Sequence, residues 1–298
     1  MSDPDERYGT LWIVATPIGT LVDLSPRAQE VFGQVDLILA EDTRRTRKLL
    51  GHFGIPAGGR ISSLHEHNED RKVSETLEAL NSGRSVALVS DAGTPVLSDP
   101  GYPLVRAARQ SGIRICSVPG PSSFTAALAA SGQPPLPATL SGFLPARPGP
   151  RRRRILELAK NPWTLVMLLS PHRLARELTD LASILGRDRE ATLLAELSKL
   201  HERAVMAPLG TLAESAEGEN PRGEYIIVIG PPSAQEEVPE ICAEDVHAEY
   251  RRAVSEGLDR RDSMRRVAQR FGLKRREVFD VLAAGPEGDE VDDESAER

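Results

Sequence analysis

Short apolar runs alternate with longer amphipathic stretches through the first 119 residues of the chain. The apolar runs, which we expect to be strands, are 11–15, 36–40, 86–89 and 113–118. The amphipathic stretches, which we expect to be helices, are 25–32, 43–51, 70–80 and 103–111. Ser25 before Pro26 is typical of a helix start, and Gly112 is typical of a helix end. The alternation predicts an α/β fold with a parallel sheet and helices on both of its faces.

A second series of strand-like runs follows, at 139–143, 164–169, 191–196, 204–207 and 225–229. Between the two series, the segment VPGPSS (118–123) and the small apolar run 124–130 indicate a strand end, a glycine turn and a close-packed helix. A Pro/Glu-rich linker from 231 to 239 follows the last run. We therefore expect an N-terminal α/β domain over residues 8–119 and a second α/β domain over residues 120–231.

The next segment is basic although the whole chain carries a net charge of −7. Residues 251–276 contain ten basic and three acidic residues. The spacing of Ala268, Gly272 and Val278 is typical of a helix-turn-helix, with Arg275 and Arg276 starting the second helix. We predict a basic helical module over 240–285 that contacts nucleic acid, a small bundle for packing or dimerisation being the alternative. Residues 286–298 are predicted to be a disordered acidic tail.

A second basic string lies in the sequence ARPGPRRRR. Pro148 and Pro150 suggest a stiff loop that presents several guanidinium groups to RNA phosphates, with a solvated loop as the alternative. The basic residues of this string are Arg147, Arg151, Arg152, Arg153 and Arg154.

The strand at 86–89 opens into turn formers and acids. Ligands of open α/β sheets bind at the carboxyl ends of the strands. Gly93 permits a close approach of backbone to ligand, and Asp91 and Asp99 offer acceptors for ribose hydroxyls or a positive charge. We predict a nucleoside-cofactor site here, an ordinary strand-to-helix connection being the alternative. The helix start at Ser122 and Ser123 offers free N–H groups to the same ligand.

Composition narrows the classes of protein. No apolar stretch is long enough to span a membrane, and the polar, acidic first ten residues differ from a signal peptide, so we expect a cytoplasmic protein. Cys116 and Cys242 are far apart and suggest neither a disulfide framework nor a metal cage. Aromatic residues make up only 4% of the chain, which argues against base stacking as the mode of RNA recognition.

Six motifs occur in a fixed order along roughly residues 10–230: ATPIGTLVDLSPRA (15–28), AEDTRRT (40–46), LHEHNE (64–69), VSDAGTPVLSDPG (89–101), VPGPSS (118–123) and GFLP (142–145). In these motifs the chain resembles the ribosomal RNA small-subunit methyltransferase I (RsmI) family, a branch of the tetrapyrrole methylase superfamily. A helix-turn-helix tail is also expected in this family.

The resemblance implies a tetrapyrrole-methylase-like fold, with two α/β domains and S-adenosylmethionine (SAM) in the cleft between them. It also implies a homodimer that methylates the ribose 2′-hydroxyl of a cytidine in the decoding region of 16S rRNA. Carried over from the family, the cofactor contacts are Thr16, Pro17, Ile18, Gly19, Asp91, Ala92, Gly93, Thr94, Pro95, Leu97, Ser122, Ser123, Leu168 and Leu169. The chain lacks the dinucleotide pattern GxGxxG, which counts against NAD.

Two positions depart from the family's pattern. Where the family often shows an aromatic residue and a glutamate before Ser-x-His-Arg, this chain has Met167, Leu168 and Leu169 before Ser170. Where the family usually shows Ala-Arg-Glu-Leu-Thr-Lys, this chain has residues 194–199, and the expected arginine is replaced by Ala195. These departures weaken any role assigned to polar residues of the second domain.

Methyl transfer from a sulfonium needs positioning and no metal, but a ribose hydroxyl is a weak nucleophile that benefits from a base. The candidate bases and polar groups are Glu41, Asp42, His65, Glu66, His67 and Asn68, with Arg44 and Arg45 as phosphate clamps. Glu41 and Asp42 could instead be a helix cap and a first-turn acid. His65 and His67 are two residues apart, a poor arrangement for a metal site.

Two other functions share some of these features. The same fold could methylate a tetrapyrrole such as a precorrin or another small molecule. A ligand-sensing regulator could use the basic module on DNA. Removal of residues 240–298 distinguishes tetrapyrrole methylation from RNA methylation, since activity on RNA should fall and activity on a tetrapyrrole need not.

Overall fold

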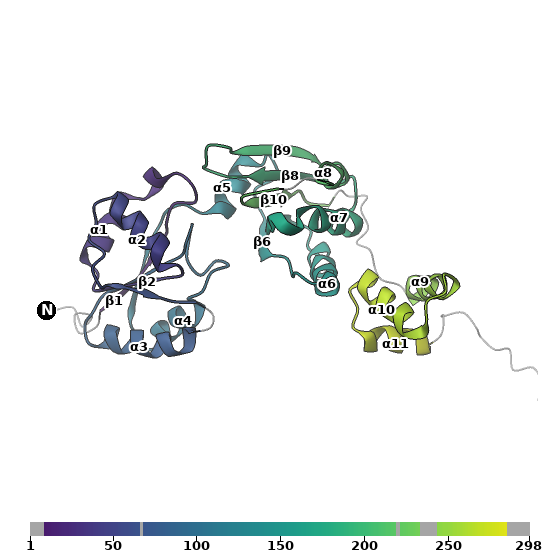
Figure 1. Ribbon diagram of the computed structural model, residues 1–298, viewed down its shortest axis with the longest axis horizontal. Helices are drawn as coiled ribbons and strands as arrows, with labels where there is room; N and C mark the ends of the chain where they lie inside the picture. The colour runs from purple at the N-terminus through teal and green to yellow at the C-terminus, as the bar shows by residue number, and fades with distance from the viewer. Residues whose placement is uncertain (1–8, 66–67, 219–220, 233–242, 285–298) are drawn as a thin grey trace, which may run out of the picture. The chain divides into compact units, whose positions relative to one another are not determined.

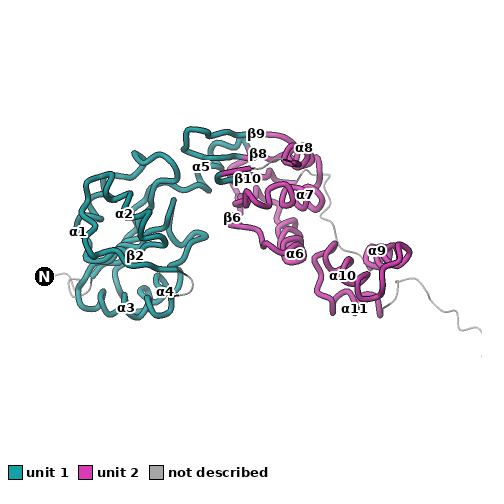
Figure 2. The backbone as a smooth tube through the Cα atoms, in the orientation of Figure 1, with its two compact units in different colours: residues 1–132, 194–205, 223–226 teal, residues 133–193, 206–222, 227–298 magenta. Residues whose placement is uncertain are grey.

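The computed structural model describes residues 9–65, 68–218, 221–232 and 243–284. The chain divides into two compact units, coloured separately in Figure 2. The first unit contains residues 1–132, 194–205 and 223–226, and the second unit contains 133–193, 206–222 and 227–298. Residues 120–132 therefore belong with the first unit, whereas the sequence placed the start of the second domain at residue 120. The predicted acidic tail and Cys242 lie outside the described residues.

The first unit is built on a five-stranded sheet of order β3-β2-β4-β1-β5. Each neighbouring pair is parallel. The four predicted strands are present, and a fifth, β3, was not predicted because three residues carry too short a pattern. The strands are β1 (Thr10–Val14), β2 (Leu37–Ala40), β3 (Ile61–Ser63), β4 (Val86–Val89) and β5 (Arg114–Val118).

Helices cover both faces of this sheet, as predicted. One apolar core lies under the first two helices and contains Phe32 and Leu50; the other contains Leu80 and Leu104 from the next two. Figure 1 shows α1 and α2 on one side of the sheet and α3 and α4 on the other. The helices are η2 (Leu21–Asp23), α1 (Pro26–Gln34), α2 (Thr43–His52), α3 (Glu69–Asn81), α4 (Tyr102–Gln110) and α5 (Ser123–Ala130).

Two predicted helix ends are confirmed by their geometry. The Ser25 hydroxyl accepts a hydrogen bond from the Ala28 N–H at 3.1 Å, which caps α1 ahead of Pro26. Gly112 follows α4 with a φ of +71°, a conformation that glycine adopts without steric cost.

The second sheet has the order β6-β7-β10-β8-β9. All five strands expected after residue 130 are present: β6 (Ala138–Phe143), β7 (Thr164–Leu169), β8 (Glu190–Ala195), β9 (Arg203–Pro208) and β10 (Tyr225–Ile229). The accompanying helices are α6 (Pro148–Ala159), η3 (Pro171–Arg173), α7 (Leu174–Leu185) and α8 (Leu209–Ser215).

The prediction of a proline-rich loop at the second basic string is wrong, because residues 148–159 form the helix α6. Pro148 and Pro150 occupy its first turn, where backbone N–H groups have no partner within the helix and proline is tolerated. The following arginines and leucines are strong helix formers.

The C-terminal module has three helices, α9 (Ala243–Ser255), α10 (Arg260–Phe271) and α11 (Arg275–Ala284). Val246, Val267, Ala268 and Val278 form its buried core. Gly272 ends α10 in the left-handed conformation, with a φ of +66°. The helix-turn-helix prediction is therefore confirmed, including the start of the second helix at Arg275.

Candidate active site

The loops after β1 and β4 are joined at the carboxyl end of the first sheet. Thr16 N–H donates to the Gly93 carbonyl at 2.9 Å, and Gly93 N–H donates to the Thr16 carbonyl at 3.0 Å. The buried Thr16 hydroxyl donates to the Ser90 carbonyl at 3.1 Å. These bonds fix the predicted cofactor segments 16–19 and 91–97 next to one another.

The loop after β5 joins the same cluster. The Thr94 hydroxyl donates to the Pro121 carbonyl at 3.2 Å. Ser122 is the N-cap of α5, and among the described residues its side chain makes no capping bond to this helix. The first N–H groups of α5 therefore remain available to a polar ligand.

The loop from residue 91 to residue 101, which we call the site loop, is conformationally strained. Val96 and Ser98 have φ values of +76° and +72°, in a region that branched side chains rarely adopt. Gly93 and Gly101 also have positive φ, at +80° and +125°. Strain of this kind persists where the surrounding structure enforces it, and it is concentrated at functional sites.

Asp91 connects the site loop to the start of α2. Its carboxylate accepts the Asp42 N–H at 3.0 Å and pairs with Arg45 at 3.2 Å. Asp42 in turn accepts the Arg44 N–H at 2.8 Å as the N-cap of α2, which is the structural alternative considered for this residue. The hydrogen bonds from Arg44 lower the pKa of Asp42 to about 2, so Asp42 is a weak base.

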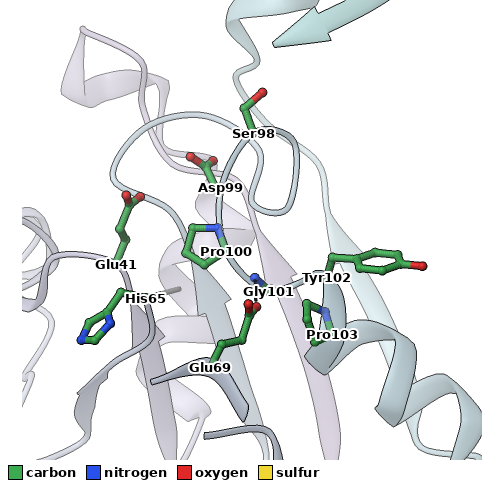
Figure 3. A pocket seen from close by; sticks show the side chains of 9 residues that line it. All are labelled: Glu41, His65, Glu69, Ser98, Asp99, Pro100, Gly101, Tyr102 and Pro103. Atoms are coloured by element: carbon green, nitrogen blue, oxygen red, sulfur yellow. Dashed lines mark hydrogen bonds between the residues drawn. The ribbon is translucent and has the colours of Figure 1, made fainter. Parts of the chain in front are cut away.

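A pocket of about 540 Å³ lies beside the site loop and contains two acids whose pKa values are raised. Burial, followed by the charge of Glu41, raises the pKa of Asp99 to about 6. Burial, followed by the charge of Asp91, raises the pKa of Glu41. Figure 3 shows the Glu41 and Asp99 carboxyl groups pointing to the same side, with the His65 ring turned away from them. The pocket is lined by Glu41, His65, Glu69, Ser98, Asp99, Pro100, Gly101, Tyr102 and Pro103.

The side chain of Asn68, one of the predicted polar residues, supports the backbone of this pocket. The Asn68 amide oxygen accepts the His65 N–H at 2.9 Å, and its amide nitrogen donates to the Ser63 carbonyl at 3.1 Å. Sequence reasoning missed Glu69, whose carboxylate accepts the Gly101 N–H at 2.7 Å, and Tyr102. It named Asp99 as an acceptor for ribose hydroxyls or a positive charge and did not name it as a base. Glu66 and His67 lie outside the described residues.

A segment distant in sequence supports the first cofactor loop. The Thr20 hydroxyl donates to the Ser198 carbonyl at 2.5 Å, and the Ser198 hydroxyl donates to Asp23 at 2.8 Å. A Cβ on Gly19 would lie 2.6 Å from the Ser198 carbonyl oxygen, so only glycine fits there. Ser198 itself has a φ of +62°. Sequence reasoning examined this segment only for its departure at Ala195.

The arginines predicted to bind RNA differ in their availability. Arg44 and Arg45 are exposed although both pair with acids. Arg151 is only 4% exposed and pairs with Asp180 at 2.7 Å, which leaves almost none of its surface for RNA. Arg147, Arg275 and Arg276 are exposed.

The remaining two predicted cofactor contacts, Leu168 and Leu169, end β7 in the second unit, and their role stays a prediction.

The described residues lack two features found in other classes of protein. They contain no group of three or more His, Cys, Asp or Glu side chains placed to hold a metal ion. No helix among them has the length and apolar character needed to cross a membrane.

Solved structures of methyltransferases share this fold. Cobalt precorrin-4 methyltransferase aligns with a TM-score of 0.56 and 18% identity over 77% of this chain and 98% of that one. Uroporphyrin-III C-methyl transferase from Thermus thermophilus, complexed with S-adenosyl homocysteine, aligns with a TM-score of 0.52 and 21% identity over 74% of this chain and 97% of that one. The family of tetrapyrrole (corrin/porphyrin) methylases matches residues 10–213. The fold and the site thus define a protein of the tetrapyrrole methylase class.

Sequence relatives identify the branch of that class. Ribosomal RNA small subunit methyltransferase I of Xylella fastidiosa is 52% identical over 74% of this chain and 81% of its own length. The protein of the same name in Synechocystis is 39% identical over 92% of this chain and 97% of its own length. The chain belongs to the ribosomal RNA small subunit methyltransferase I family. This membership confirms the resemblance found in the six motifs, and it argues against a DNA-binding regulator.

The loops of the first unit suit a nucleoside sulfonium cofactor. Gly93 has a positive φ and no Cβ, so ligand atoms can approach its backbone closely. A Cβ on Gly120 would lie 3.0 Å from the Cβ of Ala15, so the turn after β5 is also restricted to a small residue. Available N–H groups of α5 and the hydroxyls of Ser122 and Ser123 provide donors for carboxylate or ribose oxygens.

Proposed function

We propose that this chain is a SAM-dependent methyltransferase that transfers a methyl group to the ribose 2′-hydroxyl of a cytidine in the decoding region of 16S rRNA. Membership of the methyltransferase family supports SAM as the donor and small-subunit rRNA as the substrate. The observation that carries the proposal is the strained site loop, bonded to the loop after β1 and bordering a pocket with two acids of raised pKa. The cytidine and the 2′ position follow from the family resemblance.

The cofactor, when bound, supplies a methyl group on a positively charged sulfur whose departure leaves a neutral thioether. The first task of the protein is therefore to position the methyl group and the ribose oxygen in line. The paired hydrogen bonds between Thr16 and Gly93 hold two of the predicted cofactor loops, and Thr94 ties the third to them. Ser198 holds the loop that follows Gly19.

The second task is to remove the hydroxyl proton. Of the bases suggested by the sequence, Asn68 is an amide and accepts no proton at neutral pH, and Asp42 has a low pKa. Asp99, with a pKa of about 6, is ionised at neutral pH and is a stronger base than an ordinary aspartate. We propose that Asp99 accepts the proton and that burial, followed by the charge of Glu41, keeps Asp99 basic.

Recognition of RNA is proposed to use exposed cations of both units. Arg44 and Arg45 flank the candidate active site, and Arg275 and Arg276 start the second helix of the helix-turn-helix. Their contacts with phosphates would make binding sensitive to salt. The family resemblance further suggests a cytoplasmic homodimer with the cofactor in the cleft between its domains.

The proposed function is tested with small ribosomal subunits that lack the methyl group. Purified protein and labelled SAM should label one cytidine ribose, which nuclease digestion and mass spectrometry locate. Asp99→Asn should lower kcat by about 10²- to 10⁴-fold, the usual contribution of a general base, with little change in SAM affinity. Glu75→Gln, an exposed acid on α3 paired with Lys72, is the matched control and should retain full activity.

Two results would contradict parts of this proposal. Labelling of a base, or of a tetrapyrrole in place of RNA, would reject the ribose-methylation function. Full activity of the Asp99→Asn variant on the ribose would reject Asp99 as the base and leave the function standing.

A further inference from the structure

The C-terminal module, residues 243–284, has a core of its own, and its described residues make polar contacts with α6 of the same unit. Its buried residues Val246, Val267 and Val278 pack among its own three helices. Its most extensive contact with the rest of the unit is between α10 and α6, the helix that carries the arginine string, and Glu277 of α11 also pairs with Arg153 of α6. Both parts belong to the same compact unit (Figure 2). The module is thus an internally stable body held at one face.

Two arginines of the string hold the end of α10. Arg152 Nε donates to the carbonyl of Arg270 at 2.6 Å, and Arg153 Nε donates to the carbonyl of Gly272 at 2.8 Å. The last carbonyls of a helix lack partners within the helix and carry partial negative charge. A guanidinium group is therefore a suitable cap for them, and these two bonds join the module to α6.

The turn of the helix-turn-helix fits closely against the backbone of α6. A Cβ on Gly272 would lie 2.6 Å from the backbone nitrogen of Arg153. Gly272 therefore serves two purposes, because it also supplies the left-handed conformation that ends α10.

The rest of this interface is open. A pocket of about 630 Å³ remains between the module and helices α6 and α7. Its lining mixes apolar side chains such as Leu156, Ile184 and Phe271 with charged ones such as Asp180 and Arg266. Apolar side chains that line a pocket have fewer packing partners than those in a closed core. The two arginine bonds, together with the ion pair of Arg153 with Glu277 at 3.9 Å, consequently carry a large share of the attachment.

The four consecutive arginines of the string, Arg151 to Arg154, differ in what holds them. Arg151 is buried on a charged partner, Asp180, and Arg154 pairs with Glu157 of its own helix. Arg152 and Arg153 also pair with carboxylates, Asp180 at 2.6 Å and Glu277 at 3.9 Å. Unlike the other two, they donate their Nε groups to neutral carbonyls of the module, and their side chains are 21% and 38% exposed. Hydrogen bonds from guanidinium to phosphate are stronger than those to a neutral acceptor. A phosphate that reaches these two arginines can therefore displace the carbonyls.

We propose that Arg152 and Arg153 are a phosphate-sensitive latch, which holds the C-terminal module on the second unit and releases it when RNA phosphates take over the two guanidinium groups. This inference rests on the proposed function for the identity of RNA as the partner. Arg152 and Arg153 thus bind first the carbonyls of the module and then the phosphates of RNA. Release of the module allows α10 and α11 to move when the substrate is bound.

Hydrogen exchange on the full-length protein tests the latch. Arg152→Ala/Arg153→Ala should weaken docking at least about tenfold, because two hydrogen bonds from charged groups are lost. The expected result is faster exchange in peptides that cover α6 and α10. Arg154→Ala is the matched control on the same helix, and it should leave the exchange of both peptides unchanged. A short single-stranded oligoribonucleotide should accelerate exchange in the unmodified protein and have no further effect on the double variant.

Three outcomes would overturn the latch: unchanged exchange in the double variant, an equal effect of Arg154→Ala, or RNA binding that leaves the exchange of α10 unchanged. Methyl transfer to ribosomal subunits is measured separately on the same samples. Release of the module without ribose methylation would leave the latch standing and reject the proposed function. Ribose methylation without release of the module would reject the latch and leave the proposed function standing.

Discussion

The site loop after β4 and the arginine string of α6 were both identified from sequence as binding places, the first for a nucleoside cofactor and the second for RNA phosphates, yet they use their polar groups differently. Asp99 of the site loop and the neighbouring Glu41, which follows β2, face a pocket and have raised pKa values. In the arginine string, Arg151 is held by a buried ion pair with Asp180, and Arg152 is held by the same carboxylate and by the module. The local density of charge in a sequence does not say whether that charge is available, because the partners come from elsewhere in the chain.

The largest expected effect separates a structural arginine from one that binds RNA. Asp180→Ala leaves the Arg151 guanidinium buried without its carboxylate and also removes the carboxylate that pairs with Arg152, which together should lower the free energy of unfolding by about 3 to 5 kcal/mol. Glu157→Ala removes the exposed partner of Arg154 and should cost less than about 1 kcal/mol. Denaturant unfolding followed by circular dichroism measures both.

Asp180→Asn extends this test if the alanine variant does not fold, since asparagine keeps an acceptor for Arg151. Equal stabilities of the Asp180 and Glu157 variants would show that Arg151 is not held structurally. The contrast between the two regions would then be lost.

An intermediate effect is expected for the site loop. Gly93→Ala places a Cβ in the left-handed region, which should cost about 1 to 2 kcal/mol of stability. Gly112→Ala has nearly the same φ and open space around the added Cβ, so its cost in stability should be similar. We expect only Gly93→Ala to weaken SAM binding, by about tenfold, because a loss near 1.4 kcal/mol in binding corresponds to that factor. Titration calorimetry with SAM distinguishes them; equal SAM affinities would remove Gly93 from the cofactor site.

The smallest expected effect is a pH dependence. Because the pKa of Asp99 is raised to about 6 from 3.8, the folded protein binds a proton that the unfolded chain releases between about pH 4 and pH 6. Ionised Asp99 is therefore destabilising above pH 6. Asp99→Asn should raise the free energy of unfolding at pH 7.5 by about 1 kcal/mol, after allowance for solvent screening at this partly exposed group.

The gain from Asp99→Asn should shrink as the pH falls and vanish below about pH 4, where the aspartate is protonated in both states. Unfolding curves at several pH values measure this trend. A gain that is independent of pH would indicate a packing effect in place of a charge effect.

The alternating pattern of the chain allowed most of the fold to be predicted. Apolar runs marked nine of the strands, and Ser25, Pro26 and Gly112 marked helix ends, because these signals depend on near neighbours only. The helix-turn-helix was predictable for the same reason, from the spacing of Ala268, Gly272 and Val278. The helix α6 was missed because its prolines were taken as loop formers, although a first turn accepts them.

The candidate site was predictable in part. The carboxyl ends of β1, β4 and β5 were expected to meet, and the bonds among Thr16, Gly93 and Thr94 confirm this. The contact of Glu69 with Gly101 was not expected, since it depends on how α3 crosses the sheet. Long-range partners such as Asp180 for Arg151 are equally invisible in a local pattern.

The first unit is discontinuous along the chain, which has a consequence for how the protein is made. Thr20 and Ser198, which bond to each other, are 178 positions apart, and residues 223–226 also belong to this unit. A ribosome that has released only residues 1–132 has therefore not yet supplied the support for the loop after Gly19. Closing a loop of this length is slow compared with local folding. The ability to bind a methyl donor should thus arise late, after the second sheet has been synthesised, and an isolated N-terminal half should not acquire it.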